Sequence, residues 1–123
     1  MIRHLGMLVV ACALAGCGTD VWEVPLNAPP HAMTRKDPNS IAIFTTQQPP
    51  RPYTEVALME AQRQSAFSRD TSSAVMNQLR SYAAGRGCDA LILHAGGSGG
   101  TNYASQPLVG YRATCIVYQT PKD

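Results

Sequence analysis

The sequence predicts an α+β domain in which one helix packs on one face of a small β-sheet. Three observations support this class: short β-rich segments on both sides of residue 70, one segment with helical spacing between them, and turns rich in glycine or proline. The expected order is strand, strand, helix, strand, strand. Strand pairs that flank a single helix form a sheet with the helix covering one of its faces.

The four expected strands differ in how strongly the sequence supports them. Residues 41–46 are short and β-rich, and three prolines within residues 49–52 end the strand pattern. Residues 55–62 alternate like a strand, although their Ala, Met, Glu and Gln also suit a helix. Residues 88–94 form a short apolar strand, and residues 111–118 alternate between two faces of the last strand.

The expected helix follows Asp70, Thr71 and Ser72, which are all good N-cap residues. The apolar residues at helical spacing are Ala74, Val75, Met76, Leu79, Tyr82 and Ala83. Gly85 is expected at the left-handed position that ends a helix.

The N-terminal residues have the order of a secretion signal. Arg3 precedes an apolar run over residues 5–14, and the small residues Ala15 and Gly16 stand at a cleavage position. The apolar run is shorter than the roughly 20 residues that a membrane-spanning helix needs. We therefore expect a signal peptide over residues 1–16.

The stretch Leu14-Ala15-Gly16-Cys17 resembles the lipobox of bacterial lipoproteins. This resemblance implies cleavage before Cys17 and a lipid attached to Cys17, so that the protein is held on a membrane. Gly18 after the cysteine implies the periplasmic face of the outer membrane. The alternative is an ordinary secretory signal in which Cys17 is a bystander.

The remainder of the chain is expected to divide into a tether, a domain and a tail. Residues 17–39 contain the lipidated cysteine and a proline-rich tether, residues 40–119 form the domain, and residues 120–123 fray. Apolar residues within the tether, Trp22 and Val24 among them, either pack along the domain or the lipid surface or form a partner-binding peptide.

Two cysteines remain once the signal peptide is removed and Cys17 is acylated. Export would place Cys88 and Cys115 in an oxidising compartment, where free thiols tend to pair. Adjacent strands could bring their Cα atoms within the ~4.4–6.8 Å that a disulfide needs. A structural disulfide is the prediction. Two buried thiols are one alternative and a reactive pair is another, although no Cys-x-x-Cys motif is present.

A cluster of glycines before the last strand is a possible interaction loop. Its residues are Gly96, Gly97, Ser98, Gly99, Gly100 and Tyr103. The cluster lacks the Gly-Lys-Ser/Thr sequence of a phosphate-binding loop. His31, His94 and Asp89 have no partners at metal-binding or catalytic spacing. We therefore predict no catalytic residue, no metal and no cofactor.

Three segments of the domain, together with the lipobox, resemble a known family. They are residues 51–56, 87–93 and 111–118. They are similar to small proteobacterial lipoproteins related in fold to the outer-membrane sensor lipoprotein of the Rcs stress phosphorelay. The resemblance covers about residues 40–119 and implies a structural, non-catalytic domain. That sensor uses more cysteines than this chain retains, so neither its disulfide pattern nor signalling is carried over.

These observations predict a lipid-anchored, non-catalytic module of the cell envelope that binds an envelope protein or senses the state of the envelope. The basic residues are scattered and the formal net charge is +2, which excludes nucleic acid as an expected partner. The alternatives are a small periplasmic hydrolase or thiol-redox enzyme, and a passive structural lipoprotein.

Overall fold

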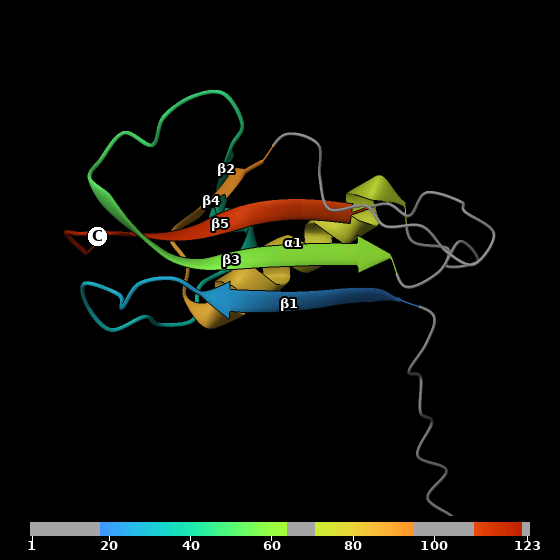
Figure 1. Cartoon of the computed structure of the whole chain (residues 1–123), viewed down its shortest axis with the longest axis horizontal. Coiled ribbons are helices and arrows are strands. Elements are labelled where there is room, and N and C mark those ends of the chain that lie inside the picture. The colour runs from blue at the N-terminus through green and yellow to red at the C-terminus, as the bar shows by residue number, and fades with distance from the viewer. Residues whose placement is uncertain (1–17, 64–70, 95–109, 122–123) are drawn as a thin grey trace, which may run out of the picture.

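Five strands and one long helix form the domain in the computed structural model, which describes residues 18–63, 71–94 and 110–121. The strands are β1 (Thr19–Pro25), β2 (Ala42–Phe44), β3 (Tyr53–Arg63), β4 (Ala90–Leu93) and β5 (Gly110–Tyr118). The helix is α1 (Ser72–Arg86), and a 3-10 turn, η1 (Pro38–Ser40), precedes β2. Figure 1 shows α1 behind a single sheet, which confirms the predicted α+β class.

The sheet has the strand order β1-β3-β5-β4-β2. The β2–β4 pair is parallel and the other pairs are antiparallel, so the sheet is mixed. The last strand in the chain, β5, lies at the centre, between β3 and β4. Since β3 pairs along both of its edges, the helical alternative for residues 55–62 is wrong.

The predicted tether over residues 17–39 is wrong for most of its length. Strand β1 pairs with β3 from Thr19 opposite Arg63 to Pro25 opposite Ala57. Further along, the Lys36 amide donates to the Ala84 carbonyl at 2.9 Å. Proline is tolerated here because Pro25 ends an edge strand and needs no further ladder donor. Within the described residues, the sheet therefore includes a strand that starts at Thr19, two residues after Cys17, and it has five strands where four were predicted.

The two faces of the sheet have separate cores, as the alternation of residues 111–118 predicts. On the face covered by α1, the fully buried side chains include Met59, Val75, Leu79, Ala83, Leu91, Ala113, Cys115 and Val117. A smaller cluster of Ala90, Ile116 and Tyr118 lies on the other face. Each buried Val, Leu or Met contributes roughly 1.5–3 kcal/mol to folding. The helix-covered face therefore supplies most of the hydrophobic stabilisation.

The ends of α1 match the prediction at the N-terminus and differ at the C-terminus. The Thr71 side chain caps the helix by accepting from the Ala74 amide at 3.2 Å. The helix runs through Gly85 and ends at Gly87, whose φ of +93° is left-handed. A Cβ on Gly87 would lie 2.8 Å from the Thr34 carbonyl oxygen. The predicted left-handed helix end at Gly85 is therefore wrong, and Gly87 takes that position where the chain packs against Met33 and Thr34.

Among the residues that the structure describes, no helix is long and apolar enough to cross a membrane.

Candidate functional site

A pocket of about 370 Å³ lies between the segment that joins β1 to η1 and the helix-covered face of the sheet. We call this segment, residues 26–37, the connector. Its floor is formed by Val56, Ala57 and Met59 of β3 and Cys115 of β5. Pro25 at the end of β1 and five connector residues form one wall: Leu26, Asn27, Ala28, Pro29 and Met33. The connector, and not α1, covers this end of the sheet, and most of the side chains that line the pocket are apolar.

An ion pair closes one side of the pocket. Arg86, the last residue of α1, places a guanidinium nitrogen 2.7 Å from a carboxylate oxygen of Glu23 on β1. Burial and the nearby Glu23 carboxylate both raise the pKa of Tyr82, one turn earlier on α1. The site thus combines an apolar interior with one charged pair at its rim, which is typical of a binding pocket.

The disulfide between Cys88 and Cys115 lies next to this pocket and confirms the predicted pairing. The two Cα atoms are 5.6 Å apart, and both residues are fully buried. The bond joins the turn after α1 to the central strand β5, so it fixes the pocket floor relative to the helix end. A buried disulfide without an exposed sulfur is typical of a structural bond rather than a redox centre.

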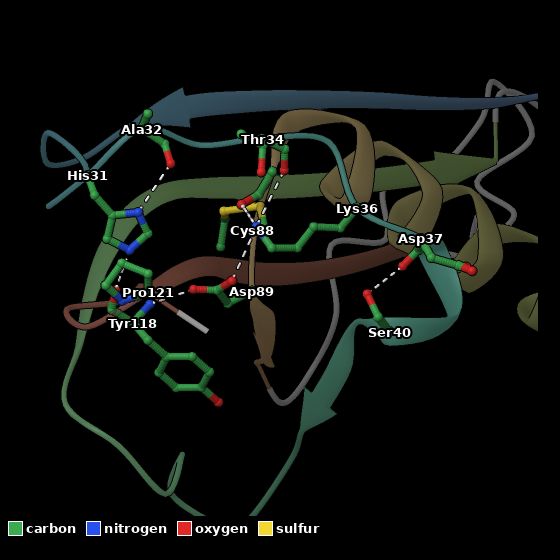
Figure 2. Close-up of polar contacts among 12 residues, drawn as sticks. His31, Ala32, Thr34, Lys36, Asp37, Ser40, Cys88, Asp89, Tyr118 and Pro121 are labelled. Carbon is green, nitrogen blue, oxygen red and sulfur yellow. Dashed lines mark hydrogen bonds and ion pairs between the residues drawn. A yellow bond between two sulfur atoms is a disulfide. The ribbon is translucent and has the colours of Figure 1, made fainter. Parts of the chain in front are cut away.

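An ion pair between the partly exposed Lys36 and the buried Asp89 holds the connector against the end of α1 and the sheet. Lys36 Nζ lies 3.2 Å from Asp89 Oδ1 and donates to the Gly87 carbonyl at 2.9 Å. The other carboxylate oxygen, Oδ2, accepts from the Tyr118 amide at 2.8 Å. Figure 2 shows these groups converging around Asp89. Both Asp89 oxygens are engaged in structural contacts, so this carboxylate is not arranged as a general base.

The two histidines of the domain contact backbone and hydroxyl groups. His31 Nε2 lies 2.8 Å from the Tyr118 carbonyl oxygen, and Nδ1 lies 3.1 Å from that of Ala32 (Figure 2). His94 Nε2 lies 2.7 Å from the Thr114 hydroxyl. Neither contact forms an acid–base pair with a carboxylate. In the described part of the chain, no group of three or more His, Cys, Asp or Glu side chains could hold a metal.

Other predicted site residues lie outside the described residues. They are Cys17 and the glycine-loop residues Gly96, Gly97, Ser98, Gly99, Gly100 and Tyr103. Lipidation of Cys17 and the interaction loop therefore stay predictions.

Sequence reasoning missed the pocket and the Lys36–Asp89 pair. Both depend on the course of the connector, which falls in the predicted tether over residues 17–39. The available signal was the β-rich composition of Val21, Trp22 and Val24, since Val and Trp are enriched in strands.

The described residues form a small α+β domain with one disulfide and a pocket beside it. No protein-family model matches this chain, and no curated protein matches it. Among solved structures, the crystal structure of the Francisella virulence factor FvfA has a similar fold, with a TM-score of 0.55. The similarity covers 83% of this chain and 99% of that chain at 13% sequence identity, and it concerns the fold alone.

Proposed function

We propose that this protein is a lipid-anchored, non-catalytic binding module on the periplasmic face of the outer membrane. In this proposal Cys17 carries the lipid, and the pocket under the connector takes an apolar group of another envelope component. The relationship to the Rcs-sensor family also belongs to this proposal, since it depends on the sequence motifs alone.

The pocket is the observation that carries this function. Its volume of about 370 Å³ falls within the roughly 300–1,000 Å³ of ordinary ligand pockets. An apolar side chain or small ring would displace water from Leu26 and Met33. Arg86 and Glu23 at the rim would orient a polar group attached to it. The site therefore suits an apolar anchor on a protein surface.

The enzyme alternatives have less support from the geometry. A thiol-redox function needs an accessible sulfur, whereas both Cys88 and Cys115 are fully buried. A hydrolase needs a nucleophile beside a base, and the base needs a group that orients it. His94 contacts the hydroxyl of the buried Thr114 on the central strand β5, and in the described part of the chain no carboxylate contacts the His94 ring.

Site-specific photo-cross-linking in cells tests the binding function. A photoreactive amino acid replaces Ala28, at the pocket wall, or Gln78, on the exposed side of α1. We expect one dominant adduct from position 28 that is absent from position 78. The adduct should also disappear when Ala57→Leu fills the pocket floor. The same set of adducts from both positions would contradict the proposed site.

A second measurement tests the anchor separately. The mass of the N-terminal peptide should show an acylated Cys17, and the Cys17→Ser variant should lose both the acyl mass and the membrane fraction. An unmodified Cys17 in the mature protein would contradict the anchor and leave the pocket as a separate question.

A further inference from the structure

Strand β1 exposes apolar side chains that the pocket does not explain. Among the described residues, the exposed large hydrophobic side chains are Trp22 (40%), Val24 (52%) and Leu26 (46%). All three lie within five consecutive positions, and Leu26 also lines the pocket. Trp22 and Val24 have no such role.

Trp22 and Val24 lie on the sheet face opposite α1. Val21 packs against the helix-side core, and Glu23 pairs with Arg86 of α1. Because side chains alternate along a strand, Trp22 and Val24 point to the other face. Figure 1 shows this face of β1, β3 and β5 without a helix over it.

A row that is apolar except for Thr114 continues from Val24 across the open face. The strand registers place Val24 beside Leu58, Leu58 beside Thr114, Thr114 beside Ile92, and Ile92 beside Phe44. In the next row Trp22 lies beside Glu60, which pairs with Arg112 at 3.0 Å. A sheet face exposed to water normally carries polar side chains, so this mixture of tryptophan, aliphatic residues and an ion pair needs another explanation.

The short distance between Cys17 and the start of β1 indicates that a lipid bilayer covers this face. Cys17 is two residues before Thr19, and two extended residues span at most about 7 Å. A lipid on Cys17 would hold the start of β1 at the bilayer surface, with no tether to lift the domain away. Tryptophan is enriched at the interface between lipid headgroups and acyl chains, where its ring is apolar and its N–H is hydrated.

We propose that the β1 side of the open sheet face lies in the interfacial layer of the bilayer, with Trp22 and Val24 among the lipid headgroups. This inference depends on the proposed lipid on Cys17. In this arrangement the membrane both holds the lipid of Cys17 and fixes the orientation of the domain. Strand β1 then lies along the membrane, while the exposed side of α1 faces away from it.

Trp22 is the only tryptophan of the chain, so its fluorescence reports on this surface alone. The mature lipidated protein is reconstituted into vesicles of phosphatidylethanolamine and phosphatidylglycerol, with or without brominated acyl chains. We expect Trp22 emission to shift to shorter wavelength and to lose more than about half its intensity with brominated lipid, as an interfacial indole should. The unanchored Cys17→Ser form without vesicles gives the reference spectrum.

A matched variant moves the reporter to the other layer of the domain. In Trp22→Phe with Gln78→Trp, the tryptophan lies on an exposed position of α1. Its emission should stay unchanged in brominated vesicles. Equal quenching at both positions would show an unoriented domain and would overturn the inference.

The remaining outcomes separate this inference from the anchor on which it depends. An acylated N-terminal peptide with unquenched Trp22 overturns the inference and leaves the anchor intact. A shift to shorter wavelength without quenching by brominated lipid means that protein, such as a second copy, covers Trp22, and it also overturns the inference. An unacylated Cys17 overturns the anchor itself.

Discussion

Asp89 shows how a single side chain joins distant parts of this chain. Its carboxylate contacts Lys36 from the connector and the Tyr118 amide at the end of β5. Because the carboxylate is buried, removing either partner leaves a polar group without compensation.

Replacing Asp89 with Asn should therefore lower the free energy of unfolding by about 2–3 kcal/mol. Lys36→Met should also destabilise the protein, because Asp89 then keeps a buried charge without its partner. The double variant should lose less than the sum of the two, as measured by urea unfolding. Additive losses would contradict a direct interaction between the two side chains.

Two tyrosines give the fold a specific sensitivity to alkaline pH. Burial and the Asp89 carboxylate raise the pKa of Tyr118 above its usual 10.0, while the Arg51 guanidinium over its ring lowers it less. The pKa of Tyr82 is raised by burial and by Glu23. An acid with a raised pKa in the folded state keeps its proton there when the unfolded chain has lost it.

The contribution of both tyrosines is therefore complete below about pH 10 and is lost as pH rises through the folded-state pKa values. We expect the free energy of unfolding to fall above about pH 10, and Tyr118→Phe to reduce the slope of that fall. Urea unfolding across this pH range measures both. An unchanged slope in the phenylalanine variant would contradict the assignment to Tyr118.

The contact between Lys36 and Asp89, which holds the connector in place, could not be predicted from the sequence. Lys36 and Asp89 each look like ordinary surface charges, and their pairing arises only when η1, α1 and β5 are in place. The disulfide was predictable because the expected signal peptide contains Cys12 and the expected lipid occupies Cys17. On that expectation Cys88 and Cys115 have only each other as partners.

At the scale of elements, the end of α1 depends on one glycine. Gly87 has a left-handed backbone, and its hydrogen faces the connector at Met33 and Thr34. Gly85 lies inside the helix with open space around its Cβ position.

The two glycines should therefore respond to alanine in opposite directions. Gly87→Ala should destabilise the domain by about 1–3 kcal/mol, because the methyl group strains the backbone and displaces the connector. Gly85→Ala should stabilise it by roughly 0.5–1 kcal/mol, because alanine favours the helical conformation. Thermal unfolding of the two variants provides the comparison. Destabilisation at Gly85 equal to that at Gly87 would contradict the assigned helix end.

Strand β1 marks the limit of element prediction from this sequence. The strands β2, β4 and β5 and the helix α1 were predicted, and β3 was predicted with a helical alternative. Strand β1 is an edge strand followed by prolines, and only the β-rich residues Val21, Trp22 and Val24 distinguish it from a tether. Partners on β3 decide its structure, and those partners are known only once the sheet is formed.

At the scale of the whole molecule, the disulfide should supply a large share of the stability. Closing the loop between Cys88 and Cys115 contributes roughly 3–4 kcal/mol in the chain-entropy model. For a domain of this size that is a major part of the roughly 5–15 kcal/mol of a native protein.

Reduction should therefore lower the midpoint of urea unfolding strongly. The Cys88→Ala/Cys115→Ala variant serves as control, because its midpoint should already be low and should not respond to reductant. A native midpoint that is the same with and without reductant would contradict a stabilising role for the bond.

The position of β5 has a consequence for the order in which the protein folds. The sheet consists of one pair, β1 with β3, and another pair, β2 with β4, and only β5 hydrogen-bonds to both. While the chain is being synthesised, the two pairs cannot join until its last strand has emerged. Until β5 is available, the apolar side chains of β1 and β3 are not covered by the rest of the sheet. They can then bind chaperones or associate with other chains. A chain truncated before Gly110 would therefore contain two unstable strand pairs that no strand joins, and it would not form a smaller version of the domain.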